Sequence, residues 1–332
     1  MFFGLEITDL FDTAGVSEFD LFPCTAKIKK VTSELCEDNV CKGWTIPAFI
    51  VRKVYQTPPF LLRTGYIMFS KIVHPLELSE SLTDIKLRIS FAVKLGAKDL
   101  TLVHVLNPGF GGKGNAESRL RQFQEVFQEL GVNVDYQAEE GHTASEISRI
   151  ARELNSDLIY IPAKGRNFLL TSLLGSVTQD VIRLADNPVW VHKQRPFLQR
   201  KESMHKAIFA TDFKEAAERS YPAVRALKGL IPELIILHVG ERAADPYAEQ
   251  IRRESVQERL GEVAEKFEPY FSRIRQSARI GSPASHILSA AEEHKADLIV
   301  LGRLNEPFPL HILGSTCARV TARAKSSILL IP

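Results

Sequence analysis

The sequence predicts an α/β protein built from two tandem, doubly wound domains, each with a five-stranded parallel sheet. Two observations carry this prediction: short apolar segments alternate with amphipathic ones, and the whole pattern occurs twice. Short runs that are almost wholly apolar are typical of strands buried on both faces. Regular alternation of strands and helices is typical of a parallel sheet with right-handed crossovers and helices on both faces.

The repeat is visible in the residues themselves. The segment GHTASEISRIARELNSDLIYIPAKG matches the later segment GSPASHILSAAEEHKADLIVLGRLN. Their opening glycines, Gly141 and Gly281, are offset by 140, and so are Asp157 and Asp297. The Gly-Ser step that follows in each copy is offset by 139, which indicates a loop one residue shorter in the second copy. Such regularity indicates two copies of one structural unit.

The first repeat, residues 68–193, opens and closes with an apolar strand. Each strand except the last is followed by a segment with helical periodicity. The predicted strands lie near 69–75, 100–106, 132–138, 157–162 and 188–192, and the predicted helices lie near 79–95, 115–131, 143–154 and 176–186.

The second repeat, residues 205–332, has four clear apolar segments, AIFA, LIILHV, ADLIVLG and SILLI, and a weaker one near SARIG. Its opening, like that of the first repeat, predicts a strand, a turn, a long helix and a strand. The segment EQIRRESVQERLGEVAEKFEPYFSRIRQ predicts a charged amphipathic helix whose charges form a solvated face.

The remaining segments match neither repeat. Residues 194–204 are polar and charged with one proline, which is typical of a linker between domains. Residues 1–67 contain prolines, scattered charge and short apolar stretches. We expect them to form a poorly ordered or loosely packed N-terminal extension.

The bulk composition favours a cytoplasmic globular protein. Hydrophobic residues make up 45% and charged residues 25%, and the net charge of +2 gives no strong case for binding nucleic acid or an anionic membrane. No apolar run approaches the roughly 18 residues of a transmembrane helix, and the first residues lack the features of a signal peptide. The four cysteines lack the spacing of common zinc sites, so we expect unpaired thiols and no bound metal. They are Cys24, Cys36, Cys41 and Cys317.

A glycine and a serine open the last helix of each repeat. The first amides of a helix have no partner within it, and the helix dipole makes this end electropositive. Glycine lets a ligand approach the backbone closely and serine adds a hydroxyl, so the pair can hold a phosphate. Serine at a helix start is also an ordinary N-cap that needs no ligand, and the two residues alone do not decide between these interpretations.

The first repeat places Gly165 just after its fourth strand, and nine residues separate it from Gly175 and Ser176. Here the chain resembles the universal stress protein family, whose nucleotide-binding loop reads Gly-x2-Gly-x9-Gly-Ser/Thr after the fourth strand. The resemblance spans both repeats and implies adenine-nucleotide alpha hydrolase-like domains. It implies phosphate contacts at Gly165, Gly175, Ser176, Gly302, Gly314 and Ser315.

The same resemblance implies a base and ribose end for each site. The family's acidic residue after the first strand aligns with Glu77 and Asp212, and its backbone contact with adenine falls at Val105 and Val239. The family's last strand pairs two subunits. For this chain the resemblance implies that the two repeats pair with each other as an internal pseudo-dimer, with Trp190 buried at the junction.

Neither copy of the motif is complete. Pro162 stands at the first motif glycine of the first repeat, and Asn305 stands at the second motif glycine of the second repeat. The second loop has eight residues before Gly314 and contains Pro307 and Pro309, which stiffen it and remove amide donors. The first repeat therefore keeps the better phosphate loop and the second the better base end.

The sequence leaves three functional readings. The first is a cytoplasmic stress-response protein that binds ATP or AMP, with Mg when bound, as a regulatory switch, and that forms the internal pair or a homodimer. The second is a degenerate tandem without nucleotide that acts as an interaction scaffold for a protein or small ligand. The third, an enzyme of a related hydrolase or ligase fold, is disfavoured because no general base and no ligase signature stands out.

Other candidate residues have simpler explanations. His104 and His238 occupy equivalent positions inside apolar strands without a positioned nucleophile, so we expect core or crevice-edge histidines. The glycine-rich segment GFGGKGN, residues 109–115, follows the second strand and predicts a flexible loop that does not bind phosphate. No catalytic residue is predicted.

Overall fold

The computed structural model describes residues 69–109, 112–163, 174–193, 203–303 and 313–332. The chain divides into two compact units, Met1–Pro59 and Phe60–Pro332, and every described residue belongs to the second. The predicted N-terminal extension, 1–67, and most of the linker, 194–202, lie outside the described residues.

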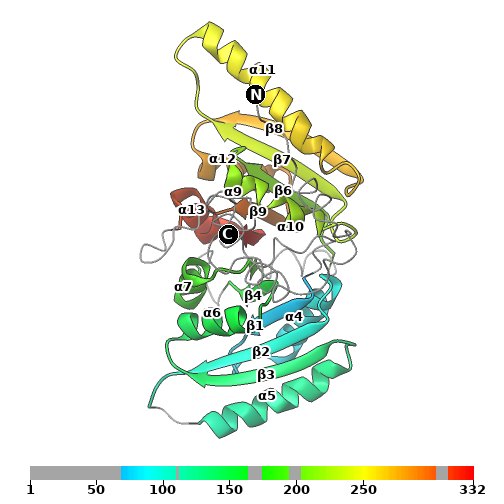
Figure 1. The fold of residues 1–332 in the computed structure, drawn as a ribbon, viewed down its shortest axis with the longest axis vertical. Coiled ribbons are helices and arrows are strands. Elements are labelled where there is room, and N and C mark those ends of the chain that lie inside the picture. Colours follow the sequence, from blue (N-terminus) through cyan, green and yellow to red (C-terminus); the bar gives the residue numbers. More distant parts are fainter. Residues whose placement is uncertain (1–68, 110–111, 164–173, 194–202, 304–312) are drawn as a thin grey trace, which may run out of the picture. The chain divides into compact units, whose positions relative to one another are not determined.

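The first repeat alternates strands and helices as its periodicity predicts (Figure 1). The observed boundaries differ from the predicted ones by at most three residues, because helix and strand ends are set by local hydrogen bonds that periodicity does not resolve. The elements are β1 (Lys71–Pro75), α4 (Leu82–Lys94), β2 (Asp99–Leu106), α5 (Lys113–Gln128), β3 (Asn133–Glu140), α6 (Thr143–Glu153), β4 (Leu158–Pro162), α7 (Ser176–Leu184) and β5 (Val189–His192).

The second repeat follows the same order with one extra helix near its start. Its long opening helix is not formed. Pro222 lies in the first turn of α10, where its missing amide costs nothing, whereas inside a continuous helix it would remove a hydrogen bond and clash with the preceding turn. The elements are β6 (Lys206–Thr211), α9 (Glu215–Glu218), α10 (Tyr221–Arg225), β7 (Glu233–Gly240), α11 (Pro246–Glu265), β8 (Arg273–Ile280), α12 (Pro283–Glu293), β9 (Leu298–Gly302), α13 (Ser315–Arg323) and β10 (Ser327–Ile331).

The prediction that the charged segment 249–276 is one helix with a solvated face is also corrected by the structure. Its helix, α11, ends at Glu265, and its last four residues belong to β8. β8 is an outer strand of the sheet with a largely exposed pattern, so it tolerates charged side chains that a central strand would exclude. Nor does every charge on α11 face solvent. Glu249 is buried and accepts hydrogen bonds from Arg252 at 2.8 and 2.9 Å.

The glycine-rich segment 109–115 is likewise not a loop throughout. α5 begins at Lys113, with Gly112 as its N-cap in the left-handed region at φ 95°. The ammonium group of Lys113 lies 3.5 Å from a carboxylate oxygen of Glu139 on β3. Lys113 therefore forms an ion pair on the surface of its own repeat.

The ten strands form one sheet in the order β3-β2-β1-β4-β5-β10-β9-β6-β7-β8 (Figure 1). All neighbours within each repeat are parallel, and β5 and β10 pair antiparallel. Each repeat thus has the strand order 3-2-1-4-5 of a doubly wound sheet, which confirms the predicted fold class. Trp190 lies opposite Leu329 at the junction of the two repeats and is fully buried.

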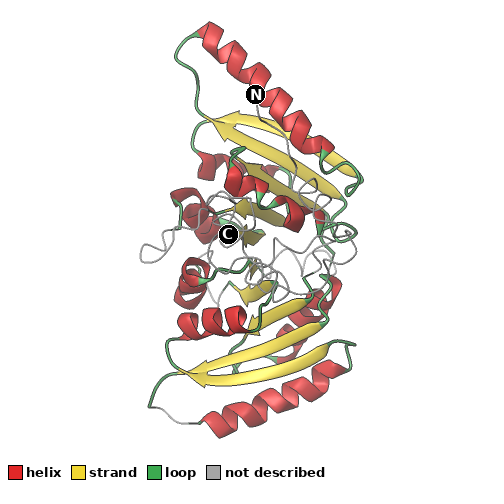
Figure 2. Ribbon diagram, viewed as in Figure 1, coloured by secondary structure: helices red, strands yellow, loops and turns green. Residues whose placement is uncertain are grey.

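Helices cover both faces of the sheet (Figure 2). One core cluster packs α4, α5, α10 and α11 on one face, with Phe91 and Leu260 among its members. The other packs α6, α7, α12 and α13 on the opposite face, with Ile147 and Val320 among its members. Both clusters contain residues of both repeats, so the core continues across the junction of β5 and β10.

The aspartates that reveal the repeat in the sequence have equivalent structural roles. One carboxylate oxygen of Asp157 accepts hydrogen bonds from the backbone amides of Ser70 and Lys71 at 3.0 and 2.9 Å. Asp297 accepts from the amides of His205 and Lys206 at 2.8 and 3.1 Å. Each buried carboxylate therefore holds the start of the central strand of its own repeat.

Candidate functional site

The predicted site lies where each sheet reverses its strand order, between β1 and β4 and between β6 and β9. Ligands of doubly wound sheets bind beyond the carboxyl ends of the strands at such a switch point. In the first repeat, α7 begins next to the end of β4. The amide of Gly175 donates to the carbonyl of Ala163 at 2.9 Å, and the hydroxyl of Thr178 donates to the carbonyl of Pro162 at 3.0 Å. These bonds direct the amino end of α7 to the carboxyl edge of the sheet.

The second repeat reproduces this arrangement with one substitution. Cys317 of α13 takes the place of Thr178, and its thiol lies 3.6 Å from the carbonyl of Gly302 at the end of β9. Burial raises the pKa of the Cys317 thiol to about 11. The thiol is therefore neutral at physiological pH, and its contact with the carbonyl of Gly302 anchors α13.

Neither helix start is capped by a side chain. The N-cap residues are Gly175 and Gly314, both in extended conformations, and neither Ser176 nor Ser315 acts as N-cap. Ser176 and Ser315 are instead the first helical residues. The alternative that these serines are ordinary N-caps is therefore wrong. Among the described residues, no side-chain bond is present that would occupy the first amides of α7 and α13, and they can receive an anion.

The two motif glycines of the second repeat have different structural reasons. A Cβ atom at Gly302 would lie 2.1 Å from the carbonyl oxygen of Ala216 in α9, so this glycine is required by close packing against the backbone. A Cβ atom at Gly314 would meet nothing within 4 Å, and its φ of −53° suits any residue. Gly314 is therefore not explained by its own backbone or by described neighbours, which is compatible with close approach of a ligand.

The base-end residues lie at the same edge of the sheet. Glu77 and Asp212 are exposed and follow β1 and β6 by two residues and one residue. A carboxylate oxygen of Asp212 accepts a hydrogen bond from the amide of Lys214 at 3.0 Å, and the amide of Glu77 donates to Glu80 at 2.8 Å. Val105 and Val239 lie near the ends of β2 and β7 and are half-buried. The topology thus brings all four to the predicted edge.

The loops between these parts lie outside the described residues. They include Gly165, Asn305, Pro307 and Pro309, and therefore the second motif position of each repeat. Pro162, at the first motif position of the first repeat, ends β4 and pairs with His192 of β5.

His104 and His238 lie at the edge of the crevice. The Nδ1 atom of His104 is 3.1 Å from the carbonyl oxygen of Leu76, and that of His238 is 2.9 Å from the carbonyl oxygen of Thr211. The ring of His238 also stacks on Phe213, with centroids 4.4 Å apart. Burial lowers the pKa of His238, which keeps the ring neutral. Each histidine thus joins two neighbouring strands of its repeat near their carboxyl ends.

Sequence reasoning missed a buried polar cluster in the first repeat. The Nδ1 atom of His74 lies 2.6 Å from the carbonyl oxygen of Tyr160, and its Nε2 atom lies 3.3 Å from Nε of Arg88. The hydroxyl of Tyr160 lies 2.9 Å from Nδ1 of His192. Arg88 is paired with Glu80 at 2.5 Å. Glu80 lies between β1 and α4, and the other residues come from β1, α4, β4 and β5. His74, Tyr160 and His192 are almost completely buried.

Comparison of the two repeats could have revealed this cluster. The equivalent positions in the second repeat are apolar: Phe209, Val300 and Ile331 replace His74, Tyr160 and His192. Because these differences fall inside core strands, they distinguish the two repeats chemically while leaving the fold unchanged.

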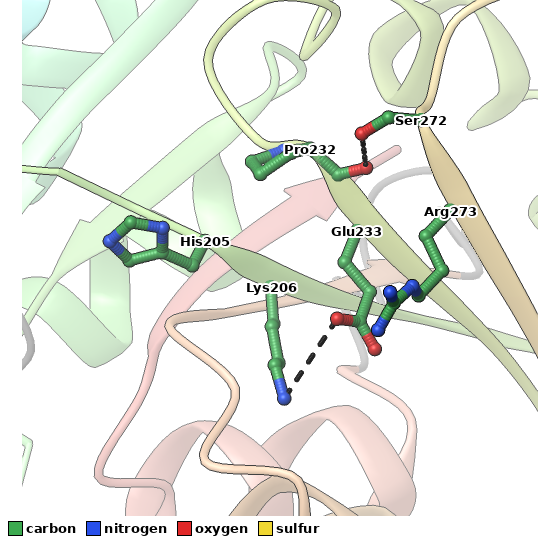
Figure 3. Close-up of a pocket in the computed structure, with 6 residues that line it drawn as sticks. All are labelled: His205, Lys206, Pro232, Glu233, Ser272 and Arg273. Atoms are coloured by element: carbon green, nitrogen blue, oxygen red, sulfur yellow. Dashed lines mark hydrogen bonds and ion pairs between the residues drawn. The ribbon is translucent and has the colours of Figure 1, made fainter.

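A hollow of about 520 Å³ lies at the other end of the sheet, where β6, β7 and β8 begin (Figure 3). Its carboxylate, Glu233, is occupied by cations of the protein, since Lys206 lies 3.9 Å and Arg275 2.8 Å from it. The hollow lies at the end of the sheet opposite to the predicted crevice. It is lined by His205, Lys206, Pro232, Glu233, Ser272 and Arg273.

In the described part of the chain, no group of three or more histidine, cysteine or carboxylate side chains could hold a metal ion. In the same residues, no helix combines the length and apolarity that crossing a membrane requires.

The fold and the helix starts define a class of protein: a tandem of doubly wound domains with a helix that follows an N-cap glycine at each switch point. Residues 68–193 and 204–332 match the model of the universal stress protein family. These two matches include most of the chain. The chain belongs to the universal stress protein family and contains two copies of its domain.

Individual relatives resemble single repeats or the tandem. A universal stress protein of Synechocystis sp. is 30% identical over 137 residues, which are 38% of this chain and 87% of that protein. Universal stress protein G of Shigella flexneri is 30% identical over 141 residues, 39% of this chain and 99% of that protein. The crystal structure of a universal stress protein from Archaeoglobus fulgidus DSM 4304 is similar with a TM-score of 0.57 at 21% identity, over 80% of this chain and 98% of that one. This last similarity shows a shared fold.

Proposed function

We propose that this protein binds an adenine nucleotide, ATP or AMP, and acts as a cytoplasmic regulatory switch in a stress response. The observation that carries the proposal is the pair of glycine-led helices, α7 and α13, whose amino ends face the switch points of their sheets. An uncapped helix start offers amides and partial positive charge to a phosphate. Membership of the universal stress protein family supports nucleotide as the source of that phosphate.

The proposed contacts follow the geometry of the two crevices. Ser176 and Ser315 donate hydroxyl and amide hydrogens to phosphate oxygens, while Gly175 and Gly314 leave room for the phosphate. In the same proposal, Gly165 and Gly302 belong to the phosphate loops. Base and ribose contact Glu77 and Val105 in the first repeat, and Asp212 and Val239 in the second. Mg bound with ATP would supply charge neutralisation at the phosphates.

Replacing the N-cap glycines should weaken nucleotide binding at the corresponding repeat. A valine at Gly175 or Gly314 keeps the extended backbone but puts branched carbons where the phosphate must approach, so we expect at least a tenfold loss of affinity per site. Native mass spectrometry of purified protein identifies the bound nucleotide and its number of copies, and calorimetry gives the affinity.

The control is Gly114→Val, because a Cβ atom at Gly114 also meets nothing within 4 Å and Gly114 lies in α5, outside the proposed site. This variant should bind nucleotide like the wild type. Protein purified without nucleotide, with no thermal shift at millimolar ATP or AMP, would contradict the proposal.

A scaffold function is the second candidate, and one observation favours it for the second repeat. The space beside Gly302, at the first position of the phosphate motif, is filled by the backbone of α9. If the second crevice binds no nucleotide, that repeat provides a fixed surface for a protein or a small ligand. One bound nucleotide per chain, lost in Gly175→Val and kept in Gly314→Val, is the result expected for a tandem in which only the first repeat binds.

We also propose that the antiparallel contact of β5 and β10 is the stable state of the chain in solution. An apolar last strand left at a sheet edge would invite pairing with another chain. In the tandem each repeat provides that partner for the other, and Trp190 is buried as a result. Association of two whole chains into a homodimer would then use a different surface.

A further inference from the structure

Arg303 belongs to the second repeat, and its side chain contacts the first repeat. It follows β9 directly, and its amide donates to the carbonyl of Ile331 at 2.7 Å, which fixes its backbone at the end of the sheet. Its guanidinium donates to the carbonyl of Ile182 at 2.6 Å and also to the carbonyl of Ala185. Both acceptors belong to the carboxyl end of α7, the helix whose amino end forms the first anion site.

The burial of Arg303 makes this contact unusual. Only 2% of the residue is exposed, and burial lowers the pKa of its guanidinium to about 10, which leaves it charged at neutral pH. Among the described residues its Nε atom has no hydrogen-bond partner, and the charge of the Asp186 carboxylate raises the pKa of Arg303 only in part against the effect of burial. A buried cation is costly unless it is compensated. The partial negative charge and unpaired carbonyls at the end of α7 supply that compensation.

The second anion-site helix is held in the reciprocal way. Lys193, which follows β5 of the first repeat, directs its ammonium group to the carbonyl of Thr321 in the last turn of α13, at 3.3 Å. Arg303 and Lys193 are not equivalent positions in the repeat, so the similarity is one of role. Each helix that opens an anion site is bonded at its other end by a cation of the opposite repeat.

We infer that Arg303 is a positioning residue for the anion site of the first repeat, acting through α7. A nine-residue helix is marginal by itself and depends on contacts at its ends. Without Arg303, the carbonyls of Ile182 and Ala185 lose their donors, the last turn frays, and the amides at Ser176 lose their fixed direction. The inference rests on the proposed nucleotide function, and it couples the first site to the second repeat.

The test uses the full chain with the second site blocked by Gly314→Val, so that only the first site titrates. In that background Arg303→Met should weaken ATP or AMP binding about five- to tenfold by calorimetry. Arg303→Lys, which keeps a donor and a charge, should recover most of the affinity. The matched control is Arg152→Met, which removes an exposed arginine paired with Asp186 beside the same helix end, and should leave the affinity unchanged.

Hydrogen exchange of the nucleotide-free protein separates positioning from general destabilisation. Arg303→Met should speed amide exchange in α7 by tenfold or more while leaving α6 unchanged, and Arg303→Lys should restore protection. Unchanged exchange in α7, faster exchange spread evenly over both repeats, or unchanged affinity would each overturn the inference. A wild type that binds no nucleotide overturns the proposed function, while exchange in α7 still decides whether Arg303 holds the helix.

Discussion

Replacing Gly302 with alanine is expected to lower the free energy of unfolding by about 3 to 5 kcal/mol, because the added methyl group meets backbone that cannot turn away. It would lie 2.1 Å from the carbonyl oxygen of Ala216 and 2.9 Å from the amide nitrogen of Ala217. α9 has only four residues, so relieving the clash requires the whole helix to move off the end of β9. Urea unfolding followed by circular dichroism, without nucleotide, measures the loss.

Gly314→Ala is the matched control in the same motif. Its methyl group enters open space in an ordinary extended conformation, so stability should change by less than about 1 kcal/mol and can rise, because alanine restricts the unfolded chain. Equal stability of the two variants would contradict the packing role of Gly302. Loss of nucleotide in a Gly302 variant is therefore no evidence for a phosphate contact, whereas loss in Gly314→Val is.

Acid is expected to destabilise the first repeat through His74 and His192. Burial and the nearby Arg88 lower the pKa of both rings to about 3. Since the carbonyl of Tyr160 can only accept, His74 must carry its proton on Nδ1 and accept from Arg88 at Nε2. A second proton, on Nε2 of His74, would face the N–H donor of Arg88 and place a positive ring beside the guanidinium. Glu80, paired with Arg88, and Tyr160 are the other titratable groups of the cluster.

The pH range follows from the two states of each histidine. In the unfolded chain the ring takes up a proton below its ordinary pKa of 6.5, while the folded ring stays neutral until about pH 3. Stability is therefore complete above pH 6.5 and falls steadily between pH 6.5 and 3. By pH 5 the loss is about 2 to 4 kcal/mol for the pair.

Trp190 reports on this cluster, because its ring lies 6.4 Å from that of Tyr160. With Trp44→Phe removing the other tryptophan, its fluorescence can follow urea unfolding at pH 7, 6 and 5. His74→Asn keeps a donor near Tyr160 but cannot titrate, so it should roughly halve the pH dependence. His142→Asn, at an exposed histidine, should leave it unchanged. The same pH dependence in His74→Asn and the wild type would disprove the role of His74.

Much of the fold could be predicted because its signals are local. The strands have short apolar runs, the helices have their periodicity, and the repeat of Asp157 at Asp297 shows one structure used twice. The Gly-Ser step likewise predicts a helix start, and α7 and α13 begin at Ser176 and Ser315 as expected. Errors occurred where a local signal is weak, as in β8, whose charges resemble a helix surface but suit an outer strand.

Only the tertiary structure decided the roles that depend on contacts between distant residues. The sequence motif makes Gly302 a predicted ligand contact, yet its missing side chain makes room for Ala216 of α9, 86 residues earlier in the chain. In the sequence, nothing distinguishes Arg303 from other charged residues near the loop motif. The pairing of β5 with β10 brings it to the end of α7. Periodicity reports which face of an element is buried, and it carries no information on which distant atoms meet there. For that reason the sequence by itself determined the two five-stranded units and their helix starts, and the packing between the repeats determined what holds the helices in place.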